Sequence, residues 1–368
     1  MHCTKKSFAI ILIVLCAVVL AAGCIFTRPS VVVPHIVVGT EESGPINATS
    51  TFLFENKRIT ISVPVDAAVY NGAKSTDHSV TIYGNVSESA WLADSVLAMV
   101  NDPAQDSMFT DLISQFRKIR DNQGLSSDEY LELLATYTQS LPYEYRPGEV
   151  AKYPVETVVD GHGDCADKSL LLAGLLSREG YKVSFFVFSP ESHMALGVGS
   201  PDLLYKDTGY TYLETTNLSY LGIPPTQLEG GAVLTSEPII IPVGNGTTLY
   251  TSGAETSYIN NMSILSKQKA LITETQVKPL FADLTGKHEQ ITGLDSQMDA
   301  LRSAGNIAAY NAQVLSQNSL TSAYNTELNA YNQKVDLEKA YVDVYNYIIL
   351  HVYDRKGTYA WVKENMPG

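Results

Sequence analysis

The chain has 368 residues, a length typical of roughly two or three domains. Hydrophobic residues make up 45% of the chain and charged residues 17%, so a substantial core can form. The formal net charge of -14 and the lack of a basic stripe argue against a nucleic acid partner, because an acidic surface repels phosphate.

The chain begins with a segment typical of an export signal. Lys5 and Lys6 precede an apolar run from Phe8 to Ala22. The run leads into the letters LAAGC, which resemble a lipobox and make Cys24 a candidate lipidation site. The alternative is an uncleaved membrane anchor over residues 7–26, which is long enough to span a bilayer. Both interpretations place the rest of the chain on the outer face of the cytoplasmic membrane or at the cell surface.

Residues 25–88 are expected to form a linker and a β-rich segment. Apolar and polar residues alternate from Phe52 to Val65, which is the period-two signature of one half-buried strand. Ser79–Tyr83 is a second candidate strand.

Apolar residues spaced three and four apart then predict three helices, over residues 89–100, 106–120 and 126–140. The last of them opens with Ser126 three residues before Glu129, which is a capping-box pattern.

A heptad pattern marks the C-terminal part of the chain. Eleven of fourteen seam positions between Ile307 and Val352 are apolar or aromatic, which predicts a coiled coil. A break near Ser303–Asn306 favours a helical hairpin, and the alternative is a dimeric coiled coil. The expected organisation is an anchor or signal (1–24), a linker with a β-rich segment (25–88), an α+β domain (89–228), a linker (229–255), a coiled coil (256–352) and a tail (353–368).

One cysteine stands apart from the others. Three of the four cysteines lie in the first 24 residues, so Cys165 has no intramolecular disulfide partner in the exported part. The sequence GHGDC contains two glycines, which predict a turn before an apolar helix over residues 169–177. Cys165 is therefore expected in the first turn of a helix, where unpaired N–H groups and the helix dipole favour a thiolate.

His193 is the best candidate for a base that activates this cysteine. It opens a predicted strand over residues 193–198, which follows another strand over residues 182–188. A third strand over residues 210–216 would bring Glu214 next to the imidazole, where a carboxylate orients the ring. His162 is closer in sequence, but it lies in the turn itself and is a poorer choice.

The run YPVETVVDGHGDCADKSLLLAGLLSREGYKV, then His193, then YLETT, resembles the transglutaminase-like superfamily. In that family a Gly-Asp-Cys turn starts a helix, and His and Asp follow on successive antiparallel strands. The resemblance covers residues 125–225 and implies a papain-like α+β fold, with a helix packed on a short antiparallel sheet. It implies that Cys165 is the nucleophile, His193 the base and Glu214 the orienting acid. The family more usually has Asp at this third position, and Asn217 is an alternative.

The remaining site residues are assigned by position. The backbone N–H of Cys165 is the expected first oxyanion donor, and Gln139 and Tyr143 are candidates for the second. Asp164 and Asp167 are expected to cap the helix. No metal-ligand spacing and no glycine-rich phosphate loop occurs, so neither a metal nor a cofactor is expected.

These features predict a surface-anchored cysteine enzyme acting on a protein or peptide substrate. Cys165 would attack an amide carbonyl, and the acyl group would pass to water, as in a protease or amidase, or to an amine, as in a transglutaminase. The sequence does not choose between them. The alternative is a non-catalytic cell-surface protein for binding or structure, which the long coiled coil favours because catalysis does not need it. The coiled coil also offers a surface for self-association.

Overall fold

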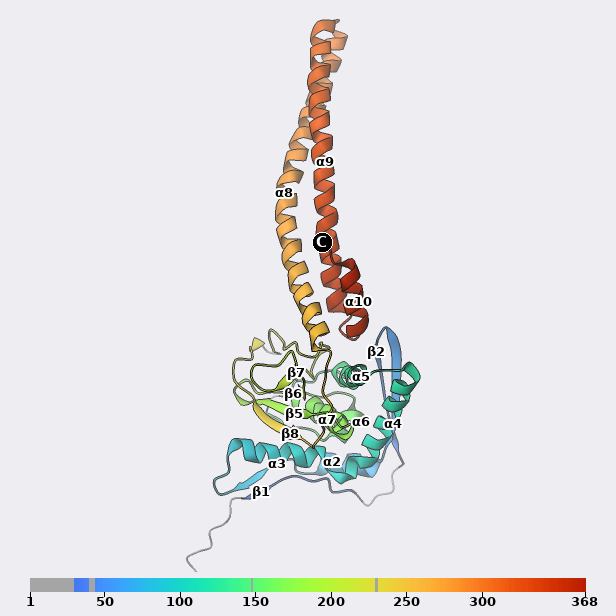
Figure 1. The fold of residues 1–368 in the computed structure, drawn as a ribbon, viewed down its shortest axis with the longest axis vertical. Coiled ribbons are helices and arrows are strands. Elements are labelled where there is room, and N and C mark those ends of the chain that lie inside the picture. Colours follow the sequence, from blue (N-terminus) through green and yellow to red (C-terminus); the bar gives the residue numbers. More distant parts are fainter. Residues whose placement is uncertain (1–29, 40–43, 147, 229–230) are drawn as a thin grey trace, which may run out of the picture.

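In the computed structural model, which describes residues 30–39, 44–146, 148–228 and 231–368, an α+β body carries a long helical hairpin. Figure 1 shows the hairpin projecting from one end of the body, with strand β1 (Ser30–Val32) near the opposite end. The expected class, α+β followed by a helical hairpin, is confirmed at this level.

A four-stranded antiparallel sheet forms the centre of the body. Its order is β7-β6-β5-β8, with the bounds β5 Val183–Phe188, β6 His193–Gly199, β7 Tyr210–Leu213 and β8 Ile239–Val243. Strand β5 is buried along its whole length, because its alternate side chains enter two different clusters. One face of the sheet packs against helix α7 (Cys165–Arg178), and an aromatic cluster covers the other.

Strand β8 comes from the segment 229–255, which was expected to be a linker. Its residues pair with β5, and Ile241 and Val243 are buried in the main core. Pro242 fits because β8 is an edge strand, where one backbone N–H needs no partner. The strand is short and contains a proline, so no clear alternation of apolar and polar residues marks it in the sequence.

Helices surround α7 on its remaining sides. The predicted helices are present as α3 (Glu88–Val100), α4 (Asp106–Gln123) and α5 (Ser127–Ser140), and the expected capping box opens α5. Helix α6 (Pro154–Asp160) leads into the turn before α7. All four helices contact α7, so the first turn of α7 is held by the core.

The expected single strand over residues 52–65 is a hairpin instead. Strands β2 (Ile46–Phe54) and β3 (Lys57–Val65) pair in antiparallel register, with Phe54 opposite Lys57. Glu55 and Asn56 form the turn with φ of 46° and 59°. The turn contains no glycine, and apolar and polar residues continue to alternate through it, so the sequence does not show that the strand reverses. The hairpin packs on α4 and α5, while β1 pairs with β4 (Thr81–Tyr83) and helix α2 (Ala67–Ser75) contacts α6.

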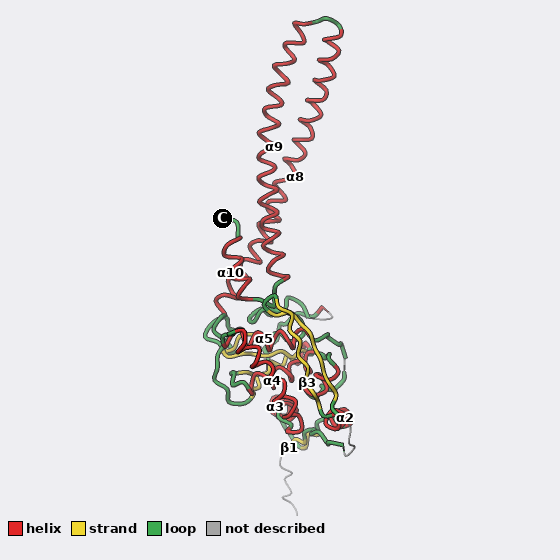
Figure 2. Tube along the Cα trace, turned by 90° about the vertical axis from the view of Figure 1, so that its right-hand side faces the viewer, coloured by secondary structure: helices red, strands yellow, loops and turns green. Residues whose placement is uncertain are grey.

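The long hairpin consists of α8 (Gly253–Ser303) and α9 (Ile307–Leu350), and Figure 2 shows the two helices side by side. The turn lies where it was predicted. Near the body, however, Tyr341, Val344 and Ile348 are buried, whereas the predicted seam residues Val342 and Ile349 are 38% and 45% exposed. Val344 and Ile348 pack there with Ile259 of α8, Val362 of the C-terminal segment and Tyr220 of the body, so contacts beyond the two-helix seam decide which face of α9 is buried near the body.

The C-terminal segment 353–368, expected to be a tail, forms helix α10 (Arg355–Asn365). Helix α10 packs beside α8 and α9, and these three helix ends together with residues 351–354 form the hairpin base. The Tyr220 hydroxyl donates to the carbonyls of Ile348 and His351, each at 3.1 Å. Arg355 Nε donates to Glu132 Oε1 of α5 at 2.5 Å. The hairpin is therefore fixed to the body at its base.

The expected signal or anchor, including Cys24, lies outside the described residues. Among the residues that are described, no helix combines the length and the apolar character needed to cross a membrane.

Candidate active site

The turn between α6 and α7 presents Cys165 as the first residue of α7. Gly161 ends α6 with a φ of 72°, and a Cβ at Gly163 would lie 2.7 Å from the Cβ of Asp167. Both positions therefore require glycine. Asp164 Oδ1 accepts from Asp167 N–H at 3.0 Å, and Asp167 Oδ2 accepts from Asp164 N–H at 3.0 Å. The predicted capping by these aspartates is confirmed.

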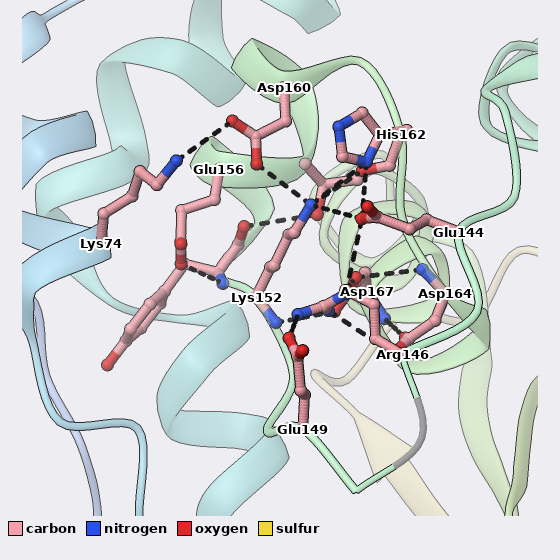
Figure 3. Close-up of polar contacts among 12 residues, drawn as sticks. Lys74, Glu144, Arg146, Glu149, Lys152, Glu156, Asp160, His162, Asp164 and Asp167 are labelled. Atoms are coloured by element: carbon pink, nitrogen blue, oxygen red, sulfur yellow. Dashed lines mark hydrogen bonds and ion pairs between the residues drawn. The ribbon is translucent and has the colours of Figure 1, made fainter.

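A network of ion pairs holds this turn from outside, as Figure 3 shows. Arg146 Nη2 contacts Asp167 Oδ2 at 2.5 Å, and Lys152 N–H donates to Asp167 Oδ1 at 2.7 Å. Lys152 Nζ reaches Asp160 Oδ2 at 3.0 Å at the end of α6. The Asp167 side chain is fully buried, so these partners leave the start of α7 little freedom.

His162 belongs to this network and not to the site around Cys165. Its Nδ1 lies 2.8 Å from Glu144 Oε2. The adjoining segment is tied to the same turn, because Gly163 N–H donates to the Pro142 carbonyl at 3.2 Å and Glu144 N–H donates to the Gly163 carbonyl at 3.1 Å. Tyr143 is thereby placed beside the turn that carries Cys165.

The sheet brings His193 to Cys165. His193 is the first residue of β6 and lies opposite Phe188, the last residue of β5. Helix α7 packs on β6, and Ser169 Oγ donates to the Met194 carbonyl at 3.2 Å. The His193 side chain is buried, and its electrostatic interactions include one with Cys165. The predicted cysteine and histidine line the same cleft.

The electrostatic environment keeps His193 protonated at neutral pH. Burial favours the neutral ring, but the interactions with Cys165 and Glu214 outweigh it and raise the pKa of His193 to about 9. Burial would raise the pKa of Glu214 as well, but the interaction with His193 and the hydrogen bonds from Thr216 lower it to about 2. An imidazolium therefore lies beside a carboxylate.

Tyr212 completes the contact between this pair. His193 Nε2 and Glu214 Oε2 are 3.5 Å apart, which is long for a direct hydrogen bond. The Tyr212 hydroxyl lies 3.2 Å from His193 Nε2 and donates to Glu214 Oε2 at 2.8 Å. Tyr212 is fully buried, and its hydroxyl shares both partners.

The other oxygen of Glu214 accepts hydrogen bonds from the two residues that follow it. Oε1 accepts from the N–H groups of Thr215 and Thr216, each at 2.9 Å, and from Thr216 Oγ1 at 2.7 Å. The carboxylate is therefore fixed although it lies just beyond the end of β7.

Gln139, a predicted oxyanion donor, holds the backbone instead. Its Nε2 donates to the carbonyls of Glu214 at 2.8 Å and Ser219 at 3.2 Å, which uses both hydrogens of the amide. Lys168 of α7 adds three further bonds, donating to the carbonyls of Gln139, Leu141 and Thr216. Burial lowers the pKa of Lys168 to about 8, although the negative charge of Glu214 acts to raise it. The end of α5 is thereby tied to the segment that carries Glu214.

The site opens into a cleft of about 540 Å³. Cys165, His193 and Glu214 contribute to its lining, and the candidates Tyr143 and Asn217 lie in it as well. The expected first oxyanion donor, the N–H of Cys165, is not occupied by the cap, whose Asp164 bonds go to the next two residues. The cleft thus combines the predicted triad with space for a substrate.

Two residues of this site were not predicted, Tyr212 and Lys168. Tyr212 could have been found, because it lies two residues before Glu214 and so faces the same side of the strand. Lys168 follows Cys165 by three residues, and nothing in the sequence marks it as buried.

Within the described residues, no group of three or more His, Cys, Asp or Glu side chains is arranged to hold a metal ion. Comparisons with known proteins add no further identification: no family model, no curated protein and no solved structure matches this chain.

Proposed function

We propose that this chain is a transglutaminase-like cysteine enzyme that acts on amide bonds of proteins or peptides through Cys165, His193 and Glu214. The observation that carries the proposal is that a cysteine at a helix N-terminus and a buried histidine, whose pKa is raised by Cys165 and Glu214, line the same cleft. Imidazolium next to the sulfur favours the thiolate, which is the reactive form.

The chemistry follows the positions of these groups. The Cys165 sulfur would attack the amide carbonyl and form a carbon–sulfur bond, with the oxyanion held by the Cys165 N–H. His193 would give its proton to the departing amine as the carbon–nitrogen bond breaks. Water or a second amine, deprotonated by His193, would then attack the thioester and release the thiolate.

The order of elements supports the resemblance to the transglutaminase-like superfamily. Cys165 begins helix α7, His193 begins β6, and Glu214 directly follows β7, which pairs with β6. A helix packed on a short antiparallel sheet agrees with the papain-like core that the resemblance implies. Glutamate in place of aspartate is accommodated by its contacts with Thr215 and Thr216.

The N-terminus and the hairpin belong to the same proposal. We infer attachment to the outer face of the cytoplasmic membrane, through lipidated Cys24 or an anchor over residues 7–26. The second candidate function is non-catalytic binding at the cell surface. It is favoured by the exposed apolar side chains along α8, such as Ile264, Leu271 and Phe281, which are 50%, 55% and 59% exposed.

Alkylation of the full chain in detergent micelles tests the catalytic proposal. Iodoacetamide at pH 7 is expected to modify Cys165 rapidly, as read by mass spectrometry of the tryptic peptide, and His193→Ala is expected to slow the reaction by about tenfold or more. Denatured protein gives the reference rate of an ordinary thiol. Equal, slow modification of both folded proteins would contradict the proposal and favour the binding function.

The reaction product then separates the two enzymatic outcomes. A casein substrate is incubated with a fluorescent primary amine and the wild-type chain. Incorporation of the amine indicates acyl transfer, and new peptide termini indicate hydrolysis. Cys165→Ser serves as the inactive control in both measurements.

A further inference from the structure

The hydroxyl of Tyr212 has a defined place in the hydrogen-bond chain of the site. It is fully buried, and it lies 3.2 Å from His193 Nε2 and 2.8 Å from Glu214 Oε2. Glu214 is ionised and can only accept, so the single hydroxyl proton of Tyr212 points to Glu214. The phenolic oxygen is then left to accept a hydrogen bond from His193.

This arrangement determines which ring nitrogen of His193 carries a proton. Because Tyr212 and Glu214 both accept, Nε2 must be a donor in the charged and in the neutral ring. The remaining nitrogen, Nδ1, is left for Cys165. We propose that Tyr212 is a positioning residue, whose hydroxyl joins His193 to Glu214 and holds the neutral imidazole with its proton on Nε2, so that Nδ1 exchanges protons with Cys165.

The consequence for Cys165 rests on the proposed function, but the hydrogen-bond geometry of Tyr212 does not. The direct contact of His193 Nε2 with Glu214 Oε2 is 3.5 Å, so the hydroxyl offers the shorter partner. The ring of Tyr212 is held by Phe186, Phe188 and Tyr205, with centroids 5.4–6.5 Å away. The hydroxyl is therefore placed by packing that does not depend on His193.

The ionisable groups around His193 come from two elements. Cys165 lies on α7, while Tyr212 and Glu214 belong to β7 and the residue after it. Lys168, also on α7, interacts electrostatically with Glu214. Burial and these acidic neighbours raise the pKa of Tyr212 above its usual value, so it stays a neutral donor throughout the working pH range.

Tyr212→Phe removes the hydroxyl and keeps the ring. Loss of a hydrogen bond to a charged partner is expected to slow iodoacetamide alkylation of Cys165 at pH 7 by about tenfold. Tyr205→Phe is the matched control, because Tyr205 belongs to the same aromatic cluster and its hydroxyl is near Lys206 instead. It is expected to leave the rate unchanged.

A double-mutant cycle separates positioning from packing. If the hydroxyl acts through Glu214, Tyr212→Phe should not slow the alkylation of Cys165 any further in the Glu214→Gln background. An effect of packing would instead slow it by the same factor as in the wild-type background. A wild-type rate in Tyr212→Phe, or a full tenfold loss on top of Glu214→Gln, overturns the proposal.

A measurement on the wild-type chain does not depend on the variants or on reactivity. With ¹⁵N-labelled histidine, the neutral ring of His193 above its pKa is expected to carry its proton on Nε2. The signal is assigned by its absence in His193→Gln. A proton on Nδ1 overturns the role of Tyr212, even if Cys165 is reactive. A proton on Nε2 together with an unreactive Cys165 supports the positioning role and contradicts the proposed function alone.

Discussion

The buried ion pair between Arg355 and Glu132 allows a quantitative test of how the hairpin is held. Arg355 Nε donates to Glu132 Oε1 at 2.5 Å, and the two side chains are 6% and 11% exposed. Arg355→Met leaves Glu132 without its cation in a buried place. Burial already raises the pKa of Glu132 to about 7, and loss of the arginine raises it further, so the carboxyl must take up a proton or stay charged without compensation. Breaking a buried pair in this way costs about 3–5 kcal/mol.

An exposed pair on the hairpin provides a control. Lys278 Nζ contacts Glu274 Oε1 at 2.8 Å, and the two side chains are 72% and 44% exposed. Solvent screens so exposed a pair, so Lys278→Met should change the stability little. In Arg355→Met/Glu132→Leu both charges are gone, and most of the loss should be recovered.

Urea unfolding followed by tryptophan fluorescence measures these differences. The chain has two tryptophans, and Trp361 of α10 stacks on Tyr347 at 3.8 Å between ring centroids. A Trp91→Phe background therefore gives a probe within the hairpin base. Equal effects of Arg355→Met and Lys278→Met would refute the reasoning, as would a double variant as unstable as Arg355→Met.

Three further predictions concern the body. The pKa of His193 is raised from 6.5 to about 9, so its contribution to stability is complete below pH 6.5 and is lost as the pH rises through about 9. The difference in unfolding free energy between wild type and His193→Gln should shrink by roughly 3 kcal/mol over that range, and a constant difference would contradict this. Gly163→Ala should destabilise the chain by about 1–3 kcal/mol and slow alkylation of Cys165, because the new Cβ would lie 2.7 Å from that of Asp167. Glu55→Gly should raise the unfolding free energy by up to about 1 kcal/mol, since φ is 46° there, and a lower unfolding free energy would speak against the turn.

The parts of the site that the sequence predicted depend on local patterns. The turn before Cys165, the helix after it and the strand that begins with His193 each leave a signal within a few residues. Their meeting could be expected from the resemblance, because the order of helix and strands is distinctive. The hairpin was equally accessible, since its seam repeats over many heptads.

The parts that were missed depend on distant contacts. Gln139 was expected near the oxyanion, but its amide is used by two carbonyls some 75 and 80 residues away in sequence. Lys168 is buried because three carbonyls from two segments meet at its amine. Strand β8 exists because β5 offers an open edge. No local pattern records such partners.

The hairpin has the geometry of a lever arm. Its 51-residue helix is about 75 Å long at 1.5 Å per residue, while its fixed end spans only the hairpin base. A tilt of about 10° at that end displaces the tip by about 13 Å. The fulcrum includes Tyr220, which follows directly after Ser219, and the Ser219 carbonyl shares the Gln139 amide with the carbonyl of Glu214. A force on the distant tip would therefore act, with smaller amplitude and greater strength, on the segment that carries Glu214.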